Sequence, residues 1–329
     1  MLAGIASHSI LTKAEFMQEI IKMILASGRT GVELSLYTIL PMMVIMMALM
    51  HVLDRKRVLR MVARGFAPVL IVFGLPGLGV FAILQILFIS FAAPVATLHI
   101  LEHDESVSDA GIAATLAAIL VMAQANAVFP LASVGLNVPV SMATSLAGGL
   151  AASFITFKLC GGKRSIRQVA AIPEEDTTQK KDEKKLIALL FEGGDAGLAI
   201  VLKSIPPLVI AIFMVNVFKR IGIIQVLESL MSPALGAIGI PGVAVLPIVT
   251  KFIAGGTAMM AILLDLMANG ALSVAELNRL AGFTLNPLDP VGLAVLLTAG
   301  PRVAKVAKPA VLAAVAGIVI RGILHLVIF

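Results

Sequence analysis

The chain contains two closely similar stretches, "GLPGLGVFAILQILFISFAAP" at 74–94 and "GIPGVAVLPIVTKFIAGGTAM" at 239–259. They lie 165 residues apart in a chain of 329 residues, so two copies of one unit would account for its whole length. Both stretches begin with Gly-x-Pro-Gly, and glycine and proline each constrain the backbone in a particular way. Their coincidence indicates an internal duplication rather than a shared preference for apolar residues.

The similarity extends along both halves of the chain. A shift of 165 residues superposes not only apolar positions but also further prolines and glycines. These pairs are Pro41 with Pro206, Pro68 with Pro233, Gly74 with Gly239, Pro76 with Pro241, and Gly77 with Gly242. We therefore divide the chain into a first repeat at 1–160, a polar linker at 161–185 and a second repeat at 186–329.

The composition places the chain in a membrane. Apolar residues make up 59% of it and the mean hydropathy is +1.04, whereas soluble domains are roughly 45–50% apolar. Seven apolar stretches are each about 20 residues long, the length that crosses a bilayer core as a helix. They lie at 34–53, 80–101, 112–131, 138–159, 198–217, 243–266 and 311–329. The sequence predicts an all-α polytopic membrane protein in contact with the lipid bilayer.

The basic balance of the chain, a net charge of +6 and a pI of about 9.6, does not predict a nucleic-acid partner. In membrane proteins Lys and Arg mainly set orientation, because they collect on the cytoplasmic side. Here they collect in the segment at 54–65 and in the linker at 161–185. We therefore expect a multi-pass protein of the cell (inner) membrane with a cytoplasmic linker.

The stretch at 80–101 does not read as one spanning helix. Its first part, at 79–92, would be only about 21 Å long, which is too short for a 30 Å core, and it meets the helix breaker Pro94. We expect a re-entrant hairpin of two half-helices here and in the second repeat. Each repeat would then contain about three spanning helices, one hairpin and one amphipathic helix. Three crossings are an odd number, so the second repeat must be inverted relative to the first.

The order of these features resembles a known family. A basic amphipathic segment is followed by Pro, "GLPG" or "GIPG", a half-helix, a small-residue break, a second half-helix and, in the second repeat, "GALSVAELNRLAGFTLNPLDP" at 270–290. This pattern resembles the nucleoside-recognition (Gate) domain family, including spore maturation proteins A and B and, more distantly, concentrative nucleoside transporters. The resemblance implies a transporter fold with alternating access but not a nucleoside as substrate. The second repeat fits better than the first, which has "FAAPV" at 91–95 and "MAQANAVFP" at 122–130.

Inverted repeats with broken helices bring half-helix ends and unwound backbone together near the bilayer midplane, where they can hold a solute. We expect this site between the two hairpin tips and the two broken helices, although "NPLDP" at 286–290 would also suit an ordinary turn between helices. The candidate residues are Gly255, Gly256, Thr257, Thr284, Asn286, Asp289, Gln124, Asn126, Lys251 and Asp265.

Lys251 and Asp265 lie within an apolar run, where an unpaired charge costs about 3 kcal/mol or more. Two interpretations stay open at this stage. The two residues pair with each other and pin the hairpin, or they contact substrate or a proton. A third charge, Lys203, either pairs with Asp289 or extends to the membrane interface.

The chain has no HExxH, GxSxG or phosphate-binding GxxxxGK[ST] motif and no Cys/His cluster. We therefore expect no enzyme, no cofactor and no metal site. The predicted function is secondary transport of a small polar solute, nucleoside-like or a small organic ion, with Na⁺ or H⁺ as a possible coupling ion. The alternative is a non-transporting membrane scaffold or accessory subunit that acts through a partner protein. Abundant Gly and Ala leave packing faces that would allow a homodimer.

Overall fold

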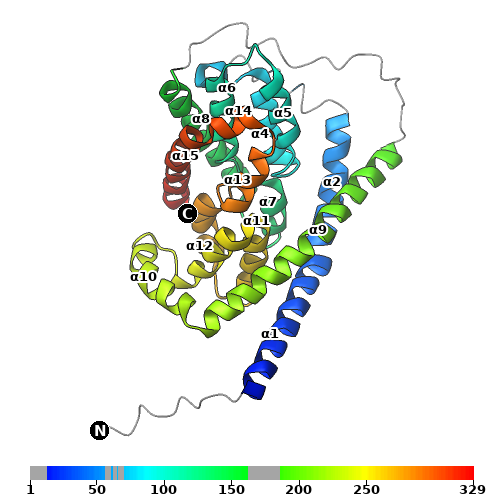
Figure 1. The fold of residues 1–329 in the computed structure, drawn as a ribbon, viewed down its shortest axis with the longest axis vertical. Helices are drawn as coiled ribbons and strands as arrows, with labels where there is room; N and C mark the ends of the chain where they lie inside the picture. Colours follow the sequence, from blue (N-terminus) through cyan, green and yellow to red (C-terminus); the bar gives the residue numbers. More distant parts are fainter. Residues whose placement is uncertain (1–12, 56–60, 62–64, 66–69, 162–185) are drawn as a thin grey trace.

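The computed structural model describes residues 13–55, 61, 65, 70–161 and 186–329. Within these ranges the chain is helical and contains no β-strand, which confirms the all-α class (Figure 1). Most of the basic segment at 54–65 and of the linker at 161–185 lies outside the described residues. Five described segments are long and apolar enough to cross a bilayer: Met17–Leu53, Val138–Leu159, Leu186–Arg220, Gly242–Ala268 and Ala307–Ile328.

The first half contains two long helical segments, at 13–55 and 138–159, with short helices between them. Its helices are α1 (Lys13–Glu33), which continues through the π-helical η1 (Leu34–Ile39) into α2 (Leu40–Arg55), then α4 (Gly77–Phe88), α5 (Pro94–His103), α6 (Asp109–Ile119), α7 (Ala125–Ala132) and α8 (Val138–Leu159). The second half contains α9 (Leu186–Arg220), α10 (Ile223–Ala237), α11 (Val245–Ala268), α12 (Val274–Thr284), α13 (Pro290–Leu297), α14 (Pro301–Lys305) and α15 (Ala307–Ile328).

The helix boundaries recur at the offset found in the sequence. Helices α12 and α13 begin and end 165 residues after α6 and α7. The apolar stretch at 112–131 is therefore not one helix, because it is interrupted at 120–124 between α6 and α7. The corresponding interruption in the second half lies at 285–289.

Local sequence explains where these short helices start. Ser108 caps α6, as its side chain accepts a hydrogen bond from the Gly111 amide, and Ser273 caps α12 in a capping box with Glu276. Helix α11 is broken at Gly255, whose φ of 82° and ψ of 179° belong to a region that side-chain-bearing residues rarely enter. This break falls within the predicted tip at 254–258, and α4 and α5 pack against each other around the matching break in the first half.

Equivalent helices of the two halves pack against each other in opposite directions. Thr144 of α8 contacts His325 of α15, and Ala152, two turns later in α8, lies beside Gly317, two turns earlier in α15. Helix α9 crosses α2 in the same antiparallel way at the edge of the molecule (Figure 1). Small residues at both contacts let the backbones touch, as is common between helices in membranes.

An ionic cluster joins the halves at the ends of the short helices. The Arg302 guanidinium, just after the start of α14, donates hydrogen bonds to the carbonyls of Glu102 and Val107 and to the carboxylate of Asp109. Lys305 adds a second contact at 3.1 Å. Hydrogen bonds from Lys305 and Arg302 hold the pKa of Asp109 below its usual range. The connection between α5 and α6 is thereby fixed to the second half.

The close contact between α8 and α15 gives a first prediction. A Cβ added to Gly317 would clash with the Gly148 backbone and lie 2.9 Å from the Ala152 Cβ. Gly317→Leu must therefore separate the two helices and lower the melting temperature by several degrees, because overpacking costs about 1–3 kcal/mol. The control is Gly236→Leu, since a Cβ on Gly236 meets nothing within 4 Å. Equal melting temperatures for the two variants in detergent would contradict this packing.

Candidate functional site

Buried polar side chains gather where the helices are interrupted. Gln124 and Asn126 come from the start of α7, Asn286 and Asp289 from the segment before α13, and Lys251 from the first part of α11. Each is no more than 5% exposed. A buried polar group needs a hydrogen-bonding partner, and a buried charge needs still more. The contacts of these five residues therefore show how the buried polar and charged groups are satisfied.

Lys251 is held by the interruption between α12 and α13. Its ammonium group donates hydrogen bonds to Asn286 Oδ1 at 2.9 Å and to the Leu288 carbonyl at 3.1 Å, and lies 3.6 Å from Asp289 Oδ2. The proposed pairing of Lys251 with Asp265 is therefore wrong. Asp265 lies at an exposed position near the end of α11, where it accepts a hydrogen bond from Asn269. The structure does not bring it into the cluster.

Asn126 connects the two helix breaks across the repeats. Its side-chain amide donates to Thr257 Oγ1 at 3.3 Å, just after the break in α11, and its oxygen accepts from the Phe91 amide at 3.4 Å, between α4 and α5. One residue at the start of α7 thus touches both tips. A movement of either tip relative to α7 must change these two contacts.

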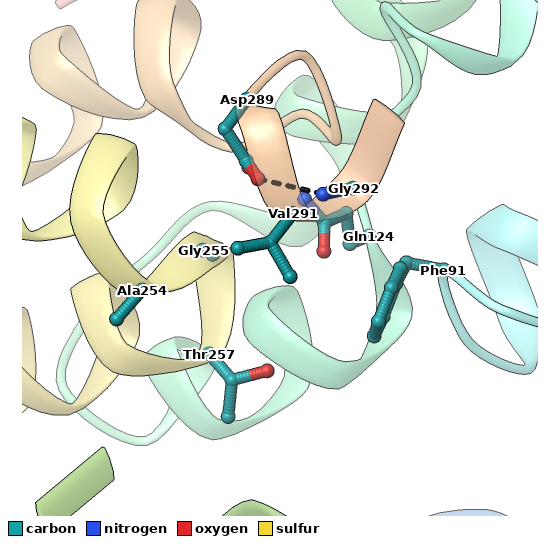
Figure 2. A pocket seen from close by; sticks show the side chains of 9 residues that line it. Phe91, Gln124, Ala254, Gly255, Thr257, Asp289, Val291 and Gly292 are labelled. Atoms are coloured by element: carbon teal, nitrogen blue, oxygen red, sulfur yellow. Dashed lines mark hydrogen bonds between the residues drawn. The ribbon is translucent and has the colours of Figure 1, made fainter. Parts of the chain in front are cut away.

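A cavity of about 40 Å³ lies between these elements. It has room for a few water molecules, since one needs roughly 10–15 Å³ on this measure. Figure 2 shows Thr257, Gln124 and Phe91 around it and the hydrogen bond that Gly292 donates to Asp289, 2.8 Å long. The lining residues are Phe91, Gln124, Ala254, Gly255, Gly256, Thr257, Asp289, Val291 and Gly292.

The structure thus brings together most of the candidate residues. Gly255, Gly256, Thr257, Gln124 and Asp289 line the cavity. Lys251 contacts Asp289 of this lining, Asn126 contacts Thr257, and Asn286 accepts a hydrogen bond from Lys251. Thr284 is different, because its hydroxyl donates to the Leu280 carbonyl one turn earlier in its own helix. Among the described residues no group of three His, Cys, Asp or Glu side chains could hold a metal ion.

Sequence reasoning missed Phe91 and Val291, both of which line the cavity. The repeat offset was a usable signal, since Phe91 is equivalent to Gly256 and Val291 to Asn126. The same offset pairs Gln124 with Asp289, and these residues occupy the N-cap positions of α7 and α13. Lys203, which was a possible partner for Asp289, is exposed on α9 and takes no part in the cluster.

A third residue that sequence reasoning missed is Arg321 of α15, which is completely buried. Its Nη1 donates to the carbonyls of Val121 at 3.2 Å and Leu285 at 2.6 Å. These carbonyls follow the C-terminal ends of α6 and α12, where the helix dipoles place about half a negative charge each. The two helix ends together therefore offset the charge of the guanidinium. Arg321 ties both interruptions to one side chain.

Comparisons with known proteins show the fold. No family model matches the chain, and no curated protein matches it. Solved structures of CNTnw, a concentrative nucleoside transporter, do match. The inward-facing substrate-bound structure has a TM-score of 0.65 at 18% identity, over 96% of this chain and 84% of CNTnw.

Other states of CNTnw match similarly. An outward-facing variant has a TM-score of 0.65 at 16% identity, and a variant in the intermediate 3 state has 0.63 at 18%, each over 95% of this chain and 84% of CNTnw. The chain therefore has the fold of a membrane protein whose solved structures include inward-facing, outward-facing and intermediate states.

The role of Arg321 gives a second prediction. Arg321→Met fills similar space but leaves the carbonyls of Val121 and Leu285 without a donor, at about 1–3 kcal/mol for each buried group. It also leaves two helix C-termini facing each other without a cation between them. We expect a clear fall in melting temperature. Arg29→Met, which removes an exposed pair with Glu33, should change it little. An Arg321→Met variant as stable as the parent would contradict this role.

Proposed function

We propose that the chain is a secondary transporter of a small polar solute, with its binding site at the cavity between the helix breaks. The observation that carries the proposal is the buried Lys251–Asp289 pair beside the cavity, together with Gln124. Charged groups inside a membrane are expensive and generally mark a pathway or a binding site. The fold adds support, because CNTnw structures with this fold include a substrate-bound one.

The mechanism we propose is alternating access between two inverted repeats with re-entrant hairpins. Two observations support it: helix boundaries that recur at an offset of 165 residues, and equivalent helices that pack antiparallel, as α8 and α15 do. In such transporters one part of the protein rocks against another around a central site. Here Asn126 would report that movement, since it holds both tips.

The site would work through a few weak and reversible contacts. Asn126 meets Thr257 and the Phe91 amide at 3.3 and 3.4 Å, near the long limit for hydrogen bonds, so a solute could replace them at small cost. Lys251, in contrast, makes two shorter hydrogen bonds and one ion pair, and it keeps the segment before α13 in place. Coupling to Na⁺ or H⁺, placement in the cell (inner) membrane with a cytoplasmic linker, and a homodimer are further parts of the proposal.

The alternative, a scaffold that acts through a partner protein, uses the same fold without a solute. It would give the buried charges only a structural role. A scaffold would keep its function when the charge of Lys251 is removed, provided that it still folds. A transporter would lose solute binding with its fold intact.

The third prediction separates these functions. A thermal-shift screen of the purified protein would cover nucleosides, nucleobases, amino acids, small organic anions and small organic cations, at two pH values and with or without sodium. A ligand that binds only the folded state raises the melting temperature. We expect at least one class to do so, and we expect Lys251→Met to abolish the shift.

The matched control is Lys203→Met, which removes an exposed lysine of α9 from the second repeat. It should retain the full ligand-induced shift. No shift from any class, or a shift that Lys251→Met leaves unchanged, would contradict the proposed site and favour the scaffold.

A further inference from the structure

We infer that the cavity takes a carboxylate group, so that the transported solute is a small organic anion. This inference rests on the proposed function and adds the chemical class of the solute. It comes from comparing two equivalent positions, Gln124 and Asp289, which lie 165 residues apart and face the same cavity. One carries a carboxylate and the other does not.

Asp289 satisfies the N-terminus of α13. Its Oδ1 accepts the hydrogen bond from the Gly292 amide at 2.8 Å, and its negative charge lies at the positive end of the helix. Its Oδ2 lies 3.6 Å from the Lys251 ammonium. Among the described residues Oδ2 accepts no hydrogen bond, but the ion pair with Lys251 offsets the charge of the carboxylate, so a cationic solute would have to compete with Lys251 for it.

The N-terminus of α7 has no such group. Gln124 occupies its N-cap position, but its side chain makes no capping hydrogen bond. The amides of Ala127 and Val128 donate to the Gln124 carbonyl, whereas the Ala125 and Asn126 amides donate no backbone hydrogen bond among the described residues. The first N–H groups of a helix require an acceptor from outside, and an anion is the preferred one.

The Gln124 side chain is the second feature that indicates a ligand. The residue is only 2% exposed, its side chain lines the cavity, and it has no hydrogen-bonding partner among the described residues (Figure 2). Gly256 lies against it, and a Cβ there would come within 2.9 Å of its Nε2. A side-chain amide that faces a cavity can donate to and accept from a polar group held there.

The charges around the site also favour an anion. Lys251 and Asp289 offset each other, and Arg321 is offset by the C-terminal ends of α6 and α12. The positive end of α7 has no charged side chain at its N-cap, whereas the Asp289 carboxylate lies beside Gly255, where the second part of α11 begins. The cavity of about 40 Å³ has room for a carboxylate, and the rest of a solute would extend out of it or require the tips to move apart.

The first test compares probes of one shape and different charge. Melting temperatures of the purified protein would be measured in butyrate, butyramide, butylamine and inorganic phosphate at constant ionic strength. We expect butyrate to raise the melting temperature by several degrees and butyramide and butylamine to leave it unchanged. Equal stabilisation by butyramide or butylamine, stabilisation by phosphate alone, or no response to butyrate would overturn the carboxylate assignment.

The second test does not depend on finding the solute. Gln124→Asp places in the first repeat the carboxylate that Asp289 provides in the second. We expect it to raise the melting temperature without ligand by about 2–4 °C and to remove the response to butyrate. Gln18→Asp, an exposed change on α1, should do neither. A lower melting temperature for folded Gln124→Asp would overturn the inference, as would a Gln124→Ala variant with an undiminished butyrate response.

The outcomes separate this inference from the proposed function. A neutral or cationic solute whose binding needs Lys251 would overturn the carboxylate assignment and leave the transporter intact. If no solute binds in the screen, the proposed transport function itself is contradicted. In that case a stabilised Gln124→Asp variant would still support an anion-binding position at α7.

Discussion

The arrangement of this protein depends on satisfying backbone groups where helices are interrupted inside the membrane. Water is absent from the bilayer core, so each carbonyl or amide freed by a break must find a partner in the protein. Arg321 meets this requirement for the carbonyls of Val121 and Leu285, one from each half. Lys251 does so for the Leu288 carbonyl. Two cationic side chains of the second half therefore fix the positions of the interruptions at 120–124 and 285–289.

The same interruptions create the candidate site. The C-terminal ends of α6 and α12 face Arg321, and the N-terminal ends of α7 and α13 face the cavity. The negative helix ends are thus occupied by a side chain of the protein, while the positive end of α7 has no capping side chain. Two N-cap positions 165 residues apart differ in this respect, because the Asp289 side chain caps α13 and the Gln124 side chain makes no capping hydrogen bond to α7.

The helical class, the duplication and the positions of the breaks could be predicted from the sequence, because Gly, Pro and Ser act locally. Gly255 marks the break in α11, and Ser108 marks the start of α6. The partner of Lys251 could not be predicted this way. In the sequence, both Asp265 and Asp289 are candidate acidic partners for Lys251. The packing of α13 beside α11 brings Asp289, and not Asp265, to the lysine.

Arg321 was missed for a similar reason. It stands in an apolar helix, and nothing in the residues beside it indicates that carbonyls of two distant segments converge there. The first helices of the two halves are longer than a single span, since α1 continues through η1 into α2, and α9 has 35 residues. Helix α9 packs along α1 and α2, and local propensity does not reveal such tertiary packing, which supplies most of a helix's stability in a protein.

The most direct test of the account is the accessibility of the cavity from the two sides of the membrane. The chain has one cysteine, Cys160, so Cys160→Ser provides a background for Thr257→Cys, which places a thiol at the cavity. The measurement is labelling by a membrane-impermeant maleimide applied separately to each face of oriented vesicles. Alternating access predicts labelling from both faces, with the ratio shifted by a bound solute. Labelling from one face alone under every condition would contradict a transporter with its site at these helix breaks.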